Sequence, residues 1–311
     1  MKIILFGTPD YVVPIFEKLA RNYEIVGVVT AQPAPVGREK KMEFSEVDYW
    51  AYKKFKKKVP ILHDPEKVLL IPASLGVVAS YGQIISQKVI DHFPQGILNV
   101  HPSLLPLHRG AAPVPASMIS NSGIGLTIIK MDYKMDHGPI VSFFKEEIGE
   151  KEMAGSLRKR LFERAAEFLV NLIPSYLDNK INLKTQNEKE ATFTRQMSKE
   201  DGFINPHILE SIITGKKSTK KTMEIEFMKG YETESNAVNL ERFIRAMDPW
   251  PKAWTNVYLS KDAKEPKRLK ILKAHLEEEK LILDEVQLEG KTAVTWEQFK
   301  DGYPKFDFKR K

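Results

Sequence analysis

The stretch KIILFGTPDYVVPIFEKLARNYEIVGVVT (residues 2–30) decides the fold. Residues 2–6 form a short apolar run, which is typical of a strand buried on both faces of a parallel sheet. Residues 11–21 place apolar side chains at helical spacing, and residues 24–30 form a second apolar run. This order of strand, helix and strand predicts the opening of a doubly wound α/β sheet.

The turn after the first predicted strand bears on the cofactor. It reads Gly7-Thr8-Pro9-Asp10 and lacks the GxGxxG pattern of dinucleotide-binding folds. A nicotinamide cofactor is therefore not indicated, although the predicted sheet is Rossmann-like. Open sheets of this type bind their ligands at the carboxyl ends of the strands, so the site is expected there.

Strands and helices continue to alternate up to residue 178. The strands are expected at 75–80, 97–101, 124–131 and 139–144, and the helices at 45–58, 85–93, 114–120 and 152–177. We therefore expect residues 1–178 to form one catalytic domain around a mostly parallel sheet.

The second half of the chain has a different pattern. Residues 179–202 are polar and lack periodicity, which is typical of a linker. Within the second domain, 203–311, alternating apolar runs over 253–296 predict a small β unit. Residues 203–236, which include the basic run GKKSTKK (215–221), form an unusual insertion for which the sequence suggests no role.

Composition excludes several classes of function. The 311 residues contain no cysteine, so disulfides and a thiol nucleophile are excluded. The seven histidines are scattered and no HExxH occurs, so no metal is expected. The apolar run at residues 3–6 is too short for a signal peptide, and no stretch approaches the ~20 apolar residues of a membrane span. We therefore expect a soluble cytoplasmic protein with no membrane partner.

The charge balance is basic. The net charge is +7 and the pI is about 9.2, which suits a polyanionic partner such as RNA. A solvated basic surface explains the same numbers, so charge alone does not decide between the two interpretations.

Three polar residues are the candidates for chemistry. Asn99 and His101 are two residues apart on a predicted strand, so their side chains share one face at the strand's carboxyl end. Asp136 follows in a loop between two later strands. An amide and a protonated imidazole can stabilise the oxyanion of an acyl transfer, and a carboxylate can assist proton transfer from an amine. An ordinary polar strand end is the competing interpretation.

The residues around this trio resemble the signature of the folate-dependent formyltransferases. NVHPSLLPLHRGAAP (99–113) and KMDYKMDHG (130–138) are similar to the family's two catalytic segments. ILFGTPDYVVPIFEKL (4–19) and ASYGQIIS (79–86) are similar to its first strand and helix and to its folate-binding strand end. Matches continue at RQMSKEDGFI, IRAMDPWPKAWT and LEGKTAVTW. The resemblance thus covers both halves of the chain.

The resemblance implies a formyltransferase domain followed by a smaller C-terminal, OB-like β-barrel that binds tRNA. It implies transfer of a formyl group from 10-formyltetrahydrofolate to the methionine of an initiator methionyl-tRNA, by a cytoplasmic monomer without metal. Asn99, His101 and Asp136 would be catalytic. The implied folate-binding residues are Gln83, Ile84, Ile85, Ser103, Leu104, Leu105, Pro106 and Asp132, and the implied tRNA-binding residues are Arg38, Lys40 and Lys41.

The sequence also departs from the family pattern. The family has Asp-Thr-Gly where this chain has Asp136-His137-Gly138, and the β unit after Trp254 is shorter than usual. Relatives with the same trio formylate an amino group on a sugar nucleotide, and this remains the main alternative. A purine-pathway amine, hydrolysis of the formyl-folate, and an RNA-binding module without catalysis are the others.

Overall fold

The structure is a computed structural model that describes residues 1–36, 41–215 and 221–308. The chain folds into two compact units. Unit 1 contains Met1–Pro113, Gly123–Glu147 and Arg158–Thr192. Unit 2 contains Val114–Ser122, Ile148–Leu157 and the chain from Phe193 onward. Within the predicted linker 179–202, residues 179–192 therefore belong to unit 1 and residues 193–202 belong to unit 2.

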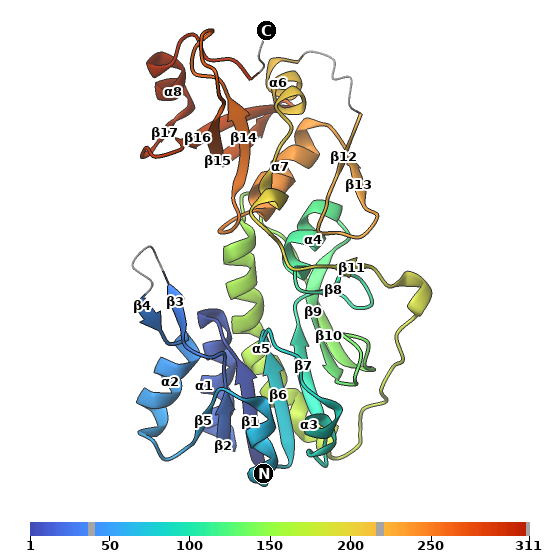
Figure 1. Ribbon diagram of the computed structural model, residues 1–311. Helices are drawn as coiled ribbons and strands as arrows, with labels where there is room; N and C mark the ends of the chain where they lie inside the picture. The colour runs from blue at the N-terminus through green and yellow to red at the C-terminus, as the bar shows by residue number, and fades with distance from the viewer. Residues whose placement is uncertain (37–40, 216–220, 309–311) are drawn as a thin grey trace. The chain divides into compact units, whose positions relative to one another are not determined.

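A seven-stranded sheet forms the centre of unit 1, in the order β10-β9-β7-β6-β1-β2-β5 (Figure 1). The first five strands along the chain pair in parallel, and β9 and β10 pair antiparallel at one edge. Their bounds are β1 Lys2–Gly7, β2 Glu24–Val29, β5 Ile61–Leu62, β6 Leu75–Ala79, β7 Ile97–His101, β9 Ile124–Lys130 and β10 Ile140–Glu146. The predicted doubly wound, mostly parallel sheet is confirmed.

Helices connect these strands and cover the sheet (Figure 1). They are α1 Val13–Asn22, α2 Glu46–Phe55, α3 Gln87–Asp91 and α5 Ala154–Leu177, with 3-10 turns at Asp10–Val12, Pro65–Leu70 and Glu188–Glu190. A short hairpin, β3 Ala34–Val36 with β4 Lys41–Glu43, and the two-residue strand β8 Arg109–Gly110 complete the unit.

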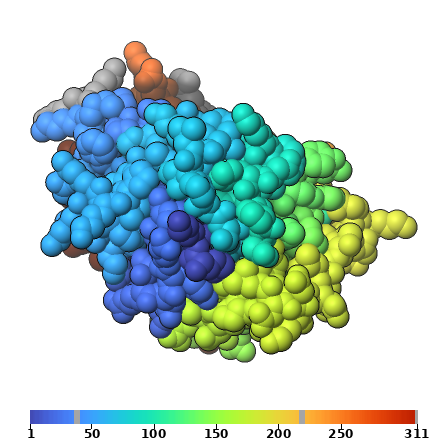
Figure 2. All heavy atoms as spheres, turned by 90° about the horizontal axis from the view of Figure 1, so that it is seen from below, coloured from blue at the N-terminus to red at the C-terminus, as the bar shows by residue number. Residues whose placement is uncertain are grey.

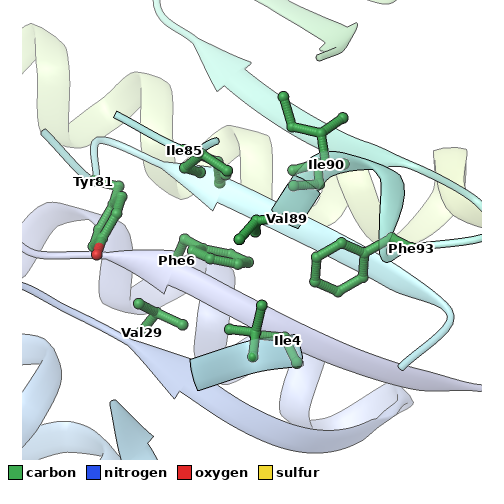
Figure 3. Packing of buried hydrophobic residues seen from close by; sticks show 11 residues of the cluster. Ile4, Phe6, Val29, Tyr81, Ile85, Val89, Ile90 and Phe93 are labelled. Atoms are coloured by element: carbon green, nitrogen blue, oxygen red, sulfur yellow. The ribbon is translucent and has the colours of Figure 1, made fainter. Parts of the chain in front are cut away.

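The core of unit 1 lies against the central strands. Phe6 on β1 is fully buried and meets Tyr81 and Phe93 edge to face, with ring centroids 5.8 and 6.1 Å away (Figure 3). Ile85 and Val89 pack in the same cluster. Each such buried side chain contributes about 1.5–3 kcal/mol to folding. This cluster fixes the loop that leaves β6.

Gly7 ends β1 where the backbone has no room for a side chain. A Cβ atom there would lie 2.7 Å from the carbonyl oxygen of Ala79 and 2.7 Å from the ring of Phe16. Glycine therefore lets the end of β1 approach both β6 and α1. The opposite end of the sheet is at the surface: in Figure 2 the first residues of the chain, in dark blue, border the yellow-green segment that includes α5.

Unit 2 is built from helices and an antiparallel sheet. Its sheet has the order β14-β15-β16-β17. The strands are Ala253–Val257, Lys267–Glu277, Lys280–Leu288 and Ala293–Thr295, and the helices are α4 Pro113–Ser120, α6 Pro206–Thr214, α7 Ala237–Ala246 and α8 Trp296–Gly302. The predicted small β unit is thus confirmed as a four-stranded antiparallel sheet.

The insertion at 203–236 has structure of its own. It contains α6 and a two-stranded hairpin, β12 Thr222–Glu224 with β13 Glu232–Glu234. Phe203 bridges to Trp254 and Met228 bridges to Thr194, so the segment pairs with both of its flanks. None of the helices in the described residues combines the length and apolarity needed to span a bilayer.

Candidate active site

The three predicted catalytic side chains lie together at the carboxyl end of β7. The amide nitrogen of Asn99 donates a hydrogen bond to Asp136 Oδ1 at 3.1 Å. His101 Nδ1 lies 3.5 Å from the same oxygen. The backbone N–H of Gly110 donates to the other carboxylate oxygen at 2.8 Å. A single carboxylate therefore holds the amide and the imidazole at one place.

Burial separates this cluster from ordinary polar residues at a strand end. The side chains of His101 and Asp136 are only 5% and 11% exposed. A buried imidazole and carboxylate persist when hydrogen bonds satisfy them, as these contacts do. The strand alternation that places Asn99 and His101 on one face is the one predicted from the sequence.

The loop 102–108 orients His101 from its other side. His101 Nε2 lies 3.2 Å from the carbonyl oxygen of His108, and because this oxygen can only accept, Nε2 carries the proton. Thr127 Oγ1 donates to Ser103 O at 2.7 Å and accepts from Leu105 N–H at 3.1 Å. The predicted folate loop is thereby fastened to β9 and positions the imidazole.

His108 itself is kept neutral. Its residue is 3% exposed, and burial, followed by the nearby His101, lowers its pKa to about 4. The neutral side chain of His108 adds no positive charge beside His101.

Stability should therefore fall as the pH drops through the range in which His108 would otherwise be protonated. The folded-state pKa of His108, about 4, lies below its ordinary value of 6.5. Protonation favours the unfolded chain, so the contribution is complete above pH 6.5 and is lost as the pH falls toward about 4. The loss is on the order of 3 kcal/mol at ~1.4 kcal/mol per pKa unit. Urea unfolding at pH 7 and pH 4.5 measures it.

The matched variant for that experiment is His108→Asn. Asparagine tolerates the positive φ of 60° at this position and does not titrate. The variant should lose less stability than the unaltered protein between the two pH values. An equal loss of stability in both proteins would contradict the assignment of this pH dependence to His108.

Contacts with neighbouring segments fix the backbone of the loop that carries Asp136. Asp136 has a φ of 49°, and a Cβ at Gly138 would lie 1.9 Å from Lys130 O. Gln186 Nε2 donates to the carbonyl oxygens of both Asp136 and Gly138 at 2.8 Å. The side chain of Gln186 therefore fixes the loop that carries the carboxylate.

A buried arginine completes this support. Arg109 is 2% exposed and donates to Gln186 Oε1 through Nε and Nη2, at 3.1 and 2.8 Å. Nη1 and Nη2 also donate to the Glu188 carboxylate at 3.0 and 2.7 Å. These hydrogen bonds lower the pKa of Glu188. Arg109, Gln186 and Glu188, which we call the Arg109 clamp, join three separate segments around Asp136.

The clamp was missed by reasoning from sequence. Gln186 and Glu188 lie in the polar stretch that was interpreted as a linker, which gives no sign of burial. The one usable signal is Arg109 in the segment His108-Arg109-Gly110, because a buried arginine needs hydrogen-bond or ion-pair partners. The sequence does not say which residues these are.

Gln186→Leu should weaken catalysis through the loop. The substitution removes the donor to two carbonyl oxygens of the Asp136 loop and one acceptor of Arg109, so we expect a loss of about 1–3 kcal/mol in folding stability for each carbonyl oxygen left unsatisfied. We expect kcat to fall about tenfold, by analogy with misplaced groups near a reacting centre, while the KM for the folate changes little. Steady-state kinetics and urea unfolding measure the two effects.

Glu188→Gln is the comparison for Gln186→Leu. This variant alters a partner of the same arginine, but the Glu188 side chain is 57% exposed. Glu188→Gln should therefore lower kcat and folding stability less than Gln186→Leu does. If both variants lowered kcat equally, a role for Gln186 in holding the Asp136 loop would not stand.

His137, the departure from the family pattern, links two loops. Its Nδ1 pairs with the Asp132 carboxylate, and its Nε2 lies 3.5 Å from Glu188 Oε1. Asp132 also accepts from the backbone N–H of Lys134 at 2.9 Å. The imidazole thus connects the Asp136 loop to the Arg109 clamp.

The residues predicted after β6 divide between core and surface. Ile85 is 8% exposed and packs in the cluster of Phe6 and Tyr81, whereas Ile84 is 92% exposed. Gln83 Oε1 accepts from the Tyr81 hydroxyl at 3.1 Å. Burial, then the Asp64 carboxylate, raises the pKa of Tyr81 to about 12, so this hydroxyl keeps its proton.

The remaining predictions concern tRNA and metals. Arg38 and Lys40 lie outside the described residues, and Lys41 is exposed at the start of β4. Among the residues that the structure describes, no group of three or more His, Asp or Glu side chains is arranged to hold a metal ion.

Sequence comparisons identify the family to which the chain belongs. The family described as "Formyl transferase" matches residues 1–173, and "Formyl transferase, C-terminal domain" matches residues 217–281. The chain belongs to the formyl transferase family. Proteins named methionyl-tRNA formyltransferase from Chloroflexus aggregans and Bacillus cereus are 34% and 33% identical to it, and each match covers 76% of the relative. These matches cover 82% and 83% of this chain.

Solved structures share the fold at lower identity. A methionyl-tRNA formyltransferase from Clostridium thermocellum has a TM-score of 0.54 at 19% identity, covering 93% of this chain and 98% of the other. A 4-N formyltransferase from Francisella tularensis has a TM-score of 0.61 at 18% identity, covering 89% and 98%. An N-formyltransferase from Helicobacter canadensis, solved with folinic acid and dTDP-3-aminofucose, has 0.61 at 14%, covering 95% and 98%.

Proposed function

We propose that the protein transfers a formyl group from 10-formyltetrahydrofolate to the amino group of methionyl-tRNA. The observation that carries this proposal is the convergence of Asn99 and His101 on one carboxylate oxygen of Asp136. Membership of the formyl transferase family supports the reaction. Relatives of 33–34% identity named methionyl-tRNA formyltransferase support the acceptor.

The folate would supply a formyl group whose carbon the amine attacks. Asn99 uses one amide hydrogen on Asp136, and its second amide hydrogen is available for the oxygen that becomes negative in the transition state. When the formyl group is bound, His101 would direct its Nε2–H, which contacts the His108 carbonyl in this structure, to the same oxygen. Asp136 receives the proton that the attacking amine loses, and this proton returns to the folate nitrogen as the carbon–nitrogen bond breaks.

The loops around the trio fit a folate. Ile84, Tyr133 and Met135 are 92%, 72% and 71% exposed, and apolar side chains of this kind suit the flat rings of a folate. Met131 packs against the cluster that holds Tyr81 and Ile85, so the loops after β6 and β9 have a common base. Ser103, Leu104, Pro106 and Asp132 would contribute the polar and apolar contacts nearest the trio.

The tRNA acceptor agrees with the basic character of the chain. The net charge is +7, and Arg38, Lys40 and Lys41 would contact the acceptor stem. Residues 203–311 would form the second, tRNA-binding domain, with residues 1–178 as the catalytic domain. Because aminoacylated tRNA is made and used in the cytoplasm, we place the protein there, acting as a monomer.

The alternative acceptor is the amino group of a sugar nucleotide. Two solved structures with the same fold point to that acceptor: one from Mycobacterium tuberculosis is named a "likely sugar N-formyltransferase", and the N-formyltransferase from Helicobacter canadensis holds dTDP-3-aminofucose, with TM-scores of 0.59 and 0.61. Their identities of 19% and 14% show a shared fold only. The sequence relatives at 33–34% identity favour the tRNA.

Transfer of a labelled formyl group tests the reaction. The protein is incubated with formyl-labelled 10-formyltetrahydrofolate and either methionyl-tRNA or the same tRNA without methionine. Label should appear in base-stable amide linkage only with the aminoacylated tRNA. Label in neither, with the folate intact, would overturn the proposed function.

A further inference from the structure

Helix α2 presents an exposed face of lysine and tyrosine side chains. Val47, Asp48 and Ala51 form its buried side. Tyr49, Tyr52, Lys53 and Lys56 recur at helical spacing on the other side, and Lys57 follows directly. These five residues, which we call the α2 lysine face, are all exposed.

The lysines of this face are not neutralised within the described chain. Lys54 is paired with Glu17 at 2.7 Å, and this hydrogen bond is the main reason that the pKa of Glu17 falls to about 2. In the parts of the chain that the structure describes, no carboxylate lies within ion-pair distance of Lys53, Lys56 or Lys57. Adjacent like charges repel one another, so an anionic partner would relieve a cost of folding.

The same lysines line a depression in the surface. Tyr52, Lys53, Lys56 and Lys57 surround a volume of about 370 Å³. Lys56 and Lys57 have φ angles of 47° and 67°, in the left-handed region where the chain leaves the helix. The turn therefore brings their side chains to the same depression as Lys53.

Aromatic rings lie next to these charges. Phe44, Tyr49 and Tyr52 are 50%, 47% and 56% exposed. The rings of Phe44 and Tyr49 meet edge to face at 6.3 Å, and the Lys57 ammonium lies 6.0 Å from the centre of the Tyr52 ring. Surfaces that bind nucleic acids combine cationic side chains, which contact phosphates, with exposed aromatic rings, which contact sugars and bases.

The face continues from the hairpin that was expected to contact tRNA. Strand β4 ends at Glu43, and α2 begins at Glu46 after a capping box between Ser45 and Asp48. A rigid, capped helix thus follows the hairpin within three residues. An RNA bound along the hairpin would have the lysine face as its next neighbour.

We propose that the α2 lysine face binds the phosphate backbone of the tRNA substrate. This inference rests on the proposed function and adds a second contact surface on the catalytic unit, separate from residues 38–41. The lysines contribute charge-assisted contacts to phosphates, and the exposed tyrosines pack against the sugar and base surface. The face carries no chemistry, so it acts on the KM for tRNA.

The test variant combines Lys53→Gln, Lys56→Asn and Lys57→Asn. Asparagine is chosen at the two positions with positive φ, since it tolerates this backbone. The matched control removes three lysines from the opposite edge of the sheet, near β10: Lys145→Gln, Lys180→Gln and Lys184→Gln. Both variants lose the same net charge.

Formylation of methionyl-tRNA is measured for both variants across a range of salt concentrations. We expect the test variant to raise the KM for tRNA about tenfold with little change in kcat, and to reduce the slope of log KM against log salt by about 2–3. The control should change the KM less than twofold. Equal effects in the two variants, or no effect, would overturn this inference while the proposed function stands. Absence of formylation by the unaltered protein would overturn the proposed function itself.

Discussion

His101→Ala is expected to lower kcat for formyl transfer by about 100- to 10,000-fold, with little change in the affinity for the folate. The imidazole lies between the Asp136 carboxylate and the His108 carbonyl, so it is oriented before the substrate binds. Alanine removes the proton on the imidazole and leaves both oxygens without this partner. Single-turnover kinetics measure the chemical step, and titration with the folate measures binding.

His92→Ala is the control for that variant. His92 lies in the cap of α3, where its Nε2 contacts Ile71 O at 3.0 Å, and it has no role in the proposed chemistry. It should retain kcat within about twofold. If His101→Ala retained more than about a tenth of the normal kcat, the role assigned to His101 would be wrong.

Asp136→Asn is expected to have the second-largest effect, a fall in kcat of about 1,000-fold. The carboxylate accepts from Asn99 through one oxygen and from Gly110 through the other. An asparagine amide must turn its NH₂ group toward one of these donors, so the contact becomes repulsive. The substitution also removes the group that takes the proton of the amine.

The comparison for Asp136→Asn is Asp91→Asn, at a carboxylate that accepts from Gln87 on the exposed side of α3. We expect that variant to behave as the unaltered protein does. Urea unfolding separates loss of structure from loss of chemistry. Near-normal turnover by a folded Asp136→Asn protein would contradict its role in proton transfer.

Local pattern was sufficient to predict much of the fold. The apolar runs and helical spacing of residues 2–30 predicted β1, α1 and β2, and the periodicity of 152–177 predicted α5. Strand alternation alone predicted that Asn99 and His101 share a face. The placement of Asp136 beside them came from the family resemblance, because a loop of this kind has no local signal. The catalytic roles of the three remain predictions.

Contacts between distant segments could not be read from the sequence. Gln186 lies 50 residues beyond Asp136 and reaches its carbonyl oxygen. Gln186 and Glu188 meet Arg109 across 77 and 79 residues, and nothing in their local pattern indicates these contacts. The hairpin within 203–236 has strands of three residues each, and alternation over so few residues is too short to recognise.

Competition between two acceptors tests the central claim most directly. The unaltered protein, labelled 10-formyltetrahydrofolate, methionyl-tRNA and an amino sugar nucleotide are combined in one reaction, and kcat/KM is determined for each acceptor. We predict that the label passes to the methionine of the tRNA with a preference of at least about 100-fold. Preferential formylation of the sugar nucleotide would leave the folate chemistry of Asn99, His101 and Asp136 in place, but it would contradict the assignment of the tRNA as substrate.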